Sequence, residues 1–343
     1  MIRPGPIAKA LPLPLVLAAL LGCPHKERSV SPPTPDIYVA GWVTTSTRPE
    51  AVLWKNGETY PLSDGNHGSQ AFGLAVSGRD VYVAGCVNDS RTDRDIAMVW
   101  KNGTPAPLTD GTRDAQAAAL ALAGKDVYAA GFQTDAGTGK TVATVWKNGA
   151  ATVLTDGAQD ARAWAVAVAG GDVYVAGSEG SNPRTQVARI WKNGVATTLT
   201  NGTRGAVASA LALFGADVYA TGYEGDVAKI WKNGRVLATL SNGAWFATGS
   251  GIAVVGKDVY VAGWVGKVAT LWKNGTPTAL TDGTRFANAW AVAVSGNDVY
   301  VAGDEFDEQA HMAELWKNGN AIPLVEGMNL ARAATVCVVV PRI

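Results

Sequence analysis

One four-residue motif, Trp-Lys-Asn-Gly, returns seven times along the chain and constrains the fold more than any other feature. A repeat of 40–46 residues is typical of solenoids, propellers and arrays, in which each unit is one supersecondary motif. The tetrads begin at Trp54, Trp100, Trp146, Trp191, Trp231, Trp272 and Trp316. A second motif, Asp-(Val/Ile)-Tyr-(Val/Ala)-(Ala/Thr)-Gly, begins at Asp36, Asp80, Asp126, Asp172, Asp217, Asp258 and Asp298.

Each repeat contains four short segments with strand character, and no window shows a useful helical period. In the second repeat these segments are residues 71–77, 80–85, 96–101 and 104–109. Asn-Gly separates the third segment from the fourth and suits a type I′ hairpin, because both residues tolerate positive φ. Four antiparallel strands in every repeat predict the blades of a β-propeller.

The two ends of the repeat region predict how the propeller closes. The chain enters its first repeat at Asp36, in a second strand, so that this repeat lacks a first strand. Residues 333–340 match the first-strand segments, and no second strand follows them. We therefore expect residues 36–343 to form an all-β, seven-bladed propeller with four antiparallel strands per blade. The C-terminal strand would join the N-terminal blade and remove the open edges of the ring.

The tryptophans of the tetrad fit the wedge shape of a blade. First-strand segments are rich in Ala and Gly, which suits the crowded axis, whereas the tetrad lies in the third strand, where neighbouring blades diverge. We expect these seven side chains to form the core between blades rather than a surface that stacks a ligand.

The first 35 residues predict a targeting segment and a tether. Arg3 and Lys9 flank the start of an apolar run that is too short to span a bilayer. The run ends in Leu20-Leu21-Gly22-Cys23, which resembles the lipobox of bacterial lipoproteins. This resemblance implies removal of residues 1–22 and acylation of Cys23, and Pro24 favours the outer membrane. Residues 23–35 then form a flexible tether; an ordinary cleaved signal with an incidental cysteine is the alternative.

Charge and histidine content argue against several functions. The 29 basic and 29 acidic residues balance, which gives no basic footprint for nucleic acid. His25, His67 and His311 lack companions at ligand or nucleophile spacing, so we expect no metal, no cofactor and no catalytic triad. Asp114 and Asp160 occupy equivalent loops and form either a carboxylate pair or simple loop caps. A Cys86–Cys337 disulfide would be compatible with a secreted compartment.

The loops predict one monotonous face and one variable face. The variable face holds the loops that enter the first strands and those that join second to third strands. Exposed aromatic rings beside amide and guanidinium groups suit a sugar or peptide ligand. The candidate ligand-binding residues on this face are Gln70, Arg113, Gln116, Arg162, Trp164, Arg204, Trp245, Arg285, Asn288 and Trp290.

Simpler interpretations of these residues stay open. Trp164 and Trp290 could pack between blades, and Arg113, Arg204 and Arg285 could be solvated loop charges. The sequence alone does not choose between these readings and the ligand site.

With its seven repeats behind a lipobox-like signal, the chain resembles the propeller-repeat lipoproteins of bacteria, which implies fold and envelope location but no activity. We expect a monomeric, non-catalytic module, held in the membrane by its N-terminal lipid, that binds a glycan or an envelope protein. A scaffold lipoprotein in outer-membrane assembly is the alternative. A lactonase or lyase is the third hypothesis and would require acid–base groups that converge at the channel mouth.

Overall fold

The computed structural model describes residues 34–44, 48–308, 310–325 and 330–340. The signal segment, Cys23, His25 and the tether up to residue 33 lie outside the described residues. The described chain is all-β, with strands β1 to β28. Within those same residues, no helix has the length and apolar character needed to cross a membrane.

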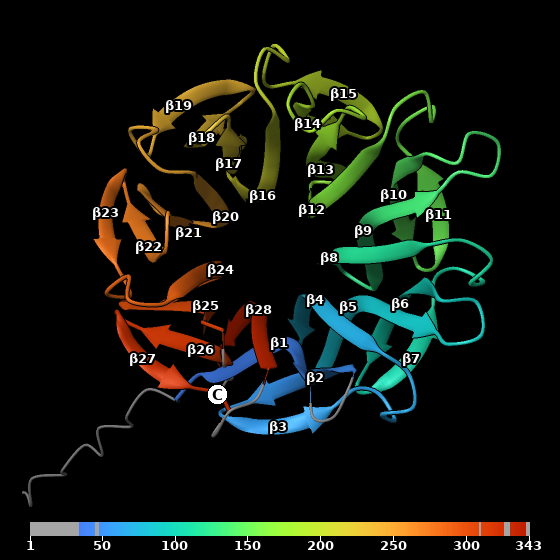
Figure 1. Ribbon diagram of the computed structural model, residues 1–343, viewed down its shortest axis with the longest axis horizontal. Helices are drawn as coiled ribbons and strands as arrows, with labels where there is room; N and C mark the ends of the chain where they lie inside the picture. The colour runs from blue at the N-terminus through green and yellow to red at the C-terminus, as the bar shows by residue number, and fades with distance from the viewer. Residues whose placement is uncertain (1–33, 45–47, 309, 326–329, 341–343) are drawn as a thin grey trace, which may run out of the picture. The chain divides into compact units, whose positions relative to one another are not determined.

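Sheets of four antiparallel strands repeat along the chain (Figure 1). In the second repeat they are β4 (Ser69–Ser77), β5 (Asp80–Asp89), β6 (Arg94–Lys101) and β7 (Thr104–Pro107). The four predicted segments are confirmed, and β5 and β6 extend further into the loop that joins them. The third and fourth repeats form the sheets β8 (Ala115–Ala123), β9 (Asp126–Thr134), β10 (Thr141–Lys147) and β11 (Ala150–Val153), and β12 (Ala161–Ala169), β13 (Asp172–Glu179), β14 (Val187–Lys192) and β15 (Val195–Thr198). The fifth repeat forms β16 (Ala206–Phe214), β17 (Asp217–Glu224), β18 (Val227–Lys232) and β19 (Arg235–Thr239). The sixth repeat forms β20 (Ala247–Val255), β21 (Asp258–Val265), β22 (Val268–Lys273) and β23 (Thr276–Ala279).

The two ends of the chain meet in one eight-stranded sheet. β28 (Leu330–Val339) pairs antiparallel with β1 (Asp36–Thr44), so the C-terminal segment takes the inner position that the sequence predicted. A single parallel bridge, His311 to Leu330, links β28 to β26. The remaining strands of this sheet are β2 (Pro49–Lys55), β3 (Glu58–Pro61), β24 (Phe286–Ser295), β25 (Asp298–Phe306), β26 (His311–Lys317) and β27 (Asn320–Pro323).

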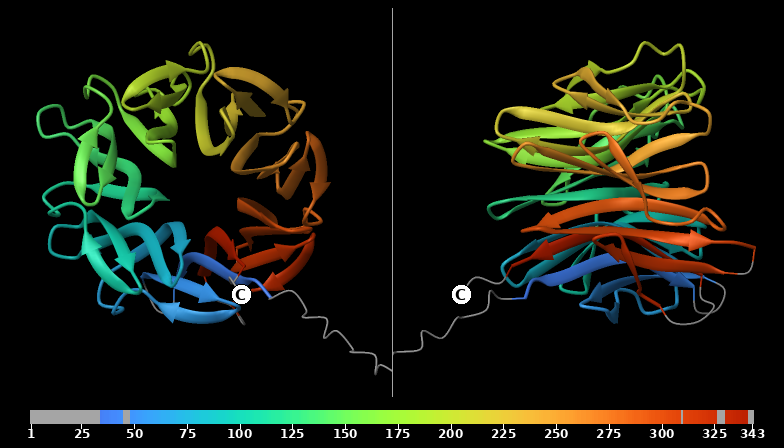
Figure 2. Two further views of the ribbon diagram at one scale, coloured as in Figure 1. Left: turned by 180° about the vertical axis from the view of Figure 1, so that it is seen from behind. Right: turned by 90° about the vertical axis from the view of Figure 1, so that its left-hand side faces the viewer.

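The inner strands follow one another around a common centre. β4, β8, β12, β16, β20 and β24 each contact the next inner strand, and β28 contacts both β24 and β4. Figure 2 shows the same succession of sheets from behind and from the side. Repeated four-stranded antiparallel sheets in this order make the fold propeller-like.

Every inner strand carries a β-bulge at the same place. In β12 the register with β13 shifts between Ala163 and Ala165, which leaves Trp164 unpaired. Across the bulge lies Gly177, where a Cβ atom would come within 2.0 Å of the Arg162 carbonyl oxygen. A bulge re-aims a side chain out of the strand alternation. The bulged residues are Phe72, Ala118, Trp164, Ser209, Ser250, Trp290 and Ala334.

The tetrad tryptophans are core residues, as predicted. Their exposed fractions are 0–1 %, and each lies between neighbouring sheets. Trp191 on β14, for example, belongs to one apolar cluster with Tyr128 and Val145 of the preceding sheet. The residues in question are Trp54, Trp100, Trp146, Trp191, Trp231, Trp272 and Trp316.

Each Lys-Asn-Gly turn bonds to the start of the second strand of its own repeat. Asn193 has φ 49°, its Oδ1 accepts the Val173 N–H at 2.8 Å, and its Nδ2 donates to Asp172 at 2.7 Å. Lys192 pairs with the same carboxylate at 2.7 Å, and Lys192 and Asn193 lower the pKa of Asp172. Positive φ at both residues of each Asn-Gly pair confirms the hairpin prediction.

We predict that Trp231→Ala lowers the free energy of unfolding by about 3–5 kcal/mol, because it empties a buried site between sheets. Val195 is 72 % exposed on β15, so Val195→Ala should change stability by less than about 0.5 kcal/mol. Urea unfolding of both variants checks this, and equal losses in the two would contradict the assignment of Trp231 to the core.

Candidate functional site

The bulged side chains converge on one cavity at the centre of the inner strands. Its volume is about 420 Å³, and it lies at the ends of strands that carry the variable loops. We call it the mouth cavity. Its lining residues are Phe72, Gln116, Ala118, Trp164, Val207, Ser209, Tyr223, Phe246, Thr248, Ser250, Trp264, Trp290, Arg332 and Ala334.

Four aromatic pairs bridge adjacent sheets, and at least one ring of each pair lines the mouth cavity. Each pair meets edge to face, an arrangement that aromatic quadrupoles favour. Trp164 and Trp290 therefore pack between sheets and also face the cavity, so the two interpretations are not exclusive. The pairs and their centroid distances are Trp42–Phe72 at 5.6 Å, Phe132–Trp164 at 6.2 Å, Tyr223–Phe246 at 5.3 Å and Trp264–Trp290 at 4.9 Å.

A buried carboxylate lies behind one part of this wall. Asp304 on β25 has no exposed surface. Its Oδ1 accepts a hydrogen bond from Trp290 Nε1, and its Oδ2 contacts His311 Nε2 and lies 3.6 Å from Arg332 Nε. A buried charge of this kind persists only with partners such as these. The equivalent positions in the other repeats are Trp42, Cys86, Phe132, Ser178, Tyr223 and Trp264.

Arg332 separates Asp304 from the cavity. Its guanidinium carbon lies 4.9 Å from the Trp42 ring centroid and 4.4 Å from that of Trp290. Burial lowers the pKa of Arg332, and Asp304 opposes that shift. The two indoles and the carboxylate therefore hold a cation at the cavity wall.

His311 lies on the other side of Asp304. Its ring centroid is 4.9 Å from that of Phe306, and a quarter of its side-chain surface is exposed. The sequence showed no companion for His311 at ligand or nucleophile spacing, yet His311 begins β26 and contacts Asp304. The available signal was Asp304 itself, a charge at a position that carries aromatic or small residues in the other repeats.

The structure distributes the predicted ligand residues over several places. Gln116, Trp164 and Trp290 line the mouth cavity. Arg162 stacks on Phe132 with 5.0 Å between its guanidinium carbon and the ring centroid. Asn288 pairs with Asp304 in the β24–β25 register.

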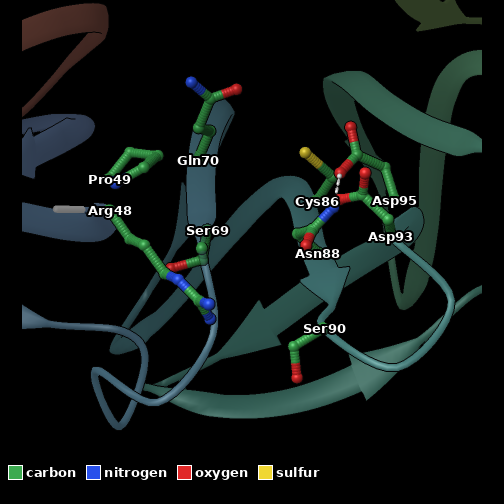
Figure 3. Close-up of a pocket in the computed structure, with 10 residues that line it drawn as sticks. Arg48, Pro49, Ser69, Gln70, Cys86, Asn88, Ser90, Asp93 and Asp95 are labelled. Carbon is green, nitrogen blue, oxygen red and sulfur yellow. Dashed lines mark hydrogen bonds between the residues drawn. The ribbon is translucent and has the colours of Figure 1, made fainter.

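The other predicted residues lie away from the mouth cavity. Trp245 lines a separate cavity of about 620 Å³, and Arg285 forms an ion pair with Asp307 at 2.9 Å. Arg113 and Arg204 are exposed on loops. Gln70 lines a further cavity of about 390 Å³, which we call the side cavity (Figure 3).

Asp114 and Asp160 bond to backbone N–H groups at the starts of β6 and β10 rather than to each other. Asp114 Oδ1 accepts the Asp95 N–H at 3.1 Å, and Asp160 Oδ1 accepts the Thr141 N–H at 3.0 Å. Both are loop caps. Cys86 and Cys337 are free thiols, so the disulfide that the compartment would allow is absent.

A pair of glutamates distinguishes strands β25 and β26 from the equivalent strands of the other repeats. In two earlier repeats the equivalent positions form ion pairs, Arg189–Glu179 at 2.6 Å and Lys229–Glu224. On β26 and β25 the same two positions hold Glu314, in place of the cation, and Glu305. The Oε2 atom of Glu314 is buried without a hydrogen-bond partner in the described structure. Burial, and then Glu305, raise the pKa of Glu314 to about 7, against a smaller opposing effect of Arg285.

We predict that the free energy of unfolding of the protein decreases as the pH rises, because of Glu314. The pKa of Glu314 is about 7 in the folded protein, above the value of about 4.3 expected in the unfolded chain. The folded state therefore binds more protons between these values, and its stability falls over that interval. Urea midpoints from about pH 5 to about pH 8 test this. Glu314→Gln should flatten the fall, and an equally steep fall in that variant would contradict the assignment.

No protein-family model matches the chain, and no curated protein matches it. A puromycin-hydrolysing peptidase of Mycobacterium tuberculosis is similar in structure, with a TM-score of 0.53 and 13 % identity, over 83 % of this chain and 53 % of that one. A putative 6-phosphogluconolactonase of Bacteroides uniformis has a TM-score of 0.49 and 14 % identity, over 89 % and 99 %. An acylaminoacyl peptidase has a TM-score of 0.47 and 13 % identity, over 84 % and 50 %.

These similarities correct one prediction. At 13 % identity the first structure shows the fold alone, and the other two are too distant to carry an argument. The chain spans about half the length of each peptidase. The first structure is named as a peptidase, and this finding contradicts the prediction of a non-catalytic binding module without enzymatic activity.

Proposed function

We propose that the chain is a hydrolytic enzyme that acts on a small acyl substrate, such as an ester or lactone, in the mouth cavity. The observation that carries the proposal is the contact of buried Asp304 with His311 and with Arg332, the one of the three that lines that cavity. Acid–base groups at the channel mouth are the condition that the lactonase or lyase hypothesis set.

Arg332 supplies the electrophilic group in this proposal. It is the cation among the residues that line the cavity, and its contacts with Trp42 and Trp290 hold its orientation. A fixed guanidinium in a partly desolvated site stabilises negative charge that develops on a carbonyl oxygen.

Asp304 and His311 supply the proton transfer. In this proposal the attacking water enters beside the Arg332 guanidinium, which keeps its place against the two indoles, and gives a proton to the Asp304 carboxylate. His311 contacts the same carboxylate on its other side and stabilises its charge. The proton then returns to the leaving oxygen. Side chains in this role contribute about 10²–10⁴-fold to a rate.

The walls favour a substrate with a ring or an apolar acyl group. Phe72, Trp164, Tyr223, Trp264 and Trp290 face a volume of about 420 Å³, which is within the size range of small-molecule sites. Gln116, Ser209, Thr248 and Ser250 add hydrogen-bonding groups to the same wall.

Two further features of the fold and location belong to the proposal. The pairing of β28 with β1 and the contacts of β28 with β24 and β4 support a closed ring of seven blades. The lipobox-like Leu20-Leu21-Gly22-Cys23 supports a lipid anchor in the bacterial envelope. Cys23→Ser should move the protein from the membrane fraction to the soluble fraction; a variant that stays in the membrane fraction would contradict the anchor.

The catalytic proposal predicts that Asp304→Asn and Arg332→Gln each lower kcat/KM by at least about 100-fold. A panel of p-nitrophenyl esters, lactones and amino-acid p-nitroanilides provides the assay. Arg113→Gln is the matched control, because Arg113 is exposed on a loop away from the mouth cavity.

Thermal melting separates lost activity from lost folding in these variants. Wild-type protein that turns over no member of the panel would contradict the proposal. Full activity in folded Asp304→Asn would also contradict it.

A further inference from the structure

The side cavity lies between the start of β2 and the β4–β6 strands. It measures about 390 Å³. Figure 3 shows Arg48 reaching in from one side, with Asp93 and Asp95 on the other side. Asn88 and Ser90 stand between these walls. The cavity therefore has a cationic wall that faces an anionic wall.

The charges on the two walls are not neutralised by neighbouring side chains. Arg48 Nη1 donates to the Asn66 carbonyl oxygen at 3.3 Å. Asp95 Oδ1 accepts from Asn88 Nδ2 at 3.4 Å. Within the described parts of the chain, Arg48, Asp93 and Asp95 form no ion pair. By contrast, the seven turn lysines are each paired with an aspartate.

The inner end of the cavity is neutral. Burial raises the pKa of the Cys86 thiol to about 12, so it carries no charge at neutral pH. Gln116 Nε2 lies 3.9 Å from its sulfur. Ser69 Oγ is already engaged, because it accepts the Ala51 N–H at 2.9 Å and donates to Ser63 at 2.8 Å. The Arg48 and Asp95 walls therefore decide which ligand charge fits.

We propose that the side cavity binds a small zwitterion, a free α-amino acid, with its carboxylate at Arg48 and its ammonium group at Asp93 and Asp95. Guanidinium groups recognise carboxylates through paired hydrogen bonds, and two carboxylates satisfy an ammonium group. A ligand with only a negative charge would be repelled by Asp93 and Asp95, and a ligand with only a positive charge would be repelled by Arg48. Among the described residues, no group of three or more possible ligands could hold a metal ion.

The size of the cavity agrees with this ligand class. A volume of about 390 Å³ is near the lower end of the range for small-molecule sites, and it accommodates one amino acid. The site is separate from the proposed catalytic residues, because neither Arg332 nor Asp304 lines it.

Calorimetry on the full-length protein in detergent tests the proposal. The twenty standard L-amino acids are titrated first, and L-alanine is then compared with propionate and ethylammonium, which each lack one of its charges. At least one amino acid should bind with a Kd below about 1 mM. Propionate and ethylammonium should bind at least tenfold more weakly than L-alanine.

Substitutions in the two walls test which wall binds which charge of the ligand. Arg48→Gln and Asp95→Asn should each weaken the amino acid at least tenfold, whereas Arg113→Gln should leave its affinity unchanged. Melting temperatures confirm that each variant is folded. Absence of binding by all twenty amino acids would overturn the proposal. So would equal binding of propionate, or unchanged affinity in folded Arg48→Gln.

Discussion

Each inner strand bulges opposite a residue that has no side chain. At Gly263 a Cβ atom would lie 1.9 Å from the Thr248 carbonyl oxygen, so the bulge and the glycine require each other. The bulged residue leaves the strand alternation and turns towards the centre. The mouth cavity depends on this geometry, because its lining includes the bulged residue of every inner strand. The same β-bulge therefore lets each repeat place its own bulged side chain at the mouth cavity.

The repeated contacts and the variable side chains occupy opposite ends of the same strands. At one end, Lys–Asp–Asn contacts and buried tetrad tryptophans recur in each repeat and hold the sheets together. At the other end the positions after the glycine range from Trp264 to Cys86 to Asp304. A change there alters the cavity without disturbing the repeated contacts. This separation allows one repeat to carry a buried acid while its neighbours carry aromatic rings.

Much of the fold could be predicted from the sequence, because strand pattern, Asn-Gly turns and core tryptophans depend on local residues. Gln116, Trp164 and Trp290, which the sequence assigned to the variable face, line the mouth cavity. The Asp304–His311–Arg332 cluster could not be predicted in this way. Its members come from β25, β26 and β28, and the packing of the C-terminal strand β28 against β24, β25 and β26 brings them together. Arg113 and Arg204 are exposed on loops, as the alternative interpretation of solvated loop charges describes.

The partnership of β28 with β1 has a consequence for synthesis of the protein. Translation produces β1 long before β28. The inner edge of β1 therefore stays unpaired until β28 has been synthesised. An unpaired strand edge is a template for another nascent chain. A premature stop before Leu330 would leave that edge open permanently, so loss of residues 330–343 should cause aggregation rather than a slightly shorter protein.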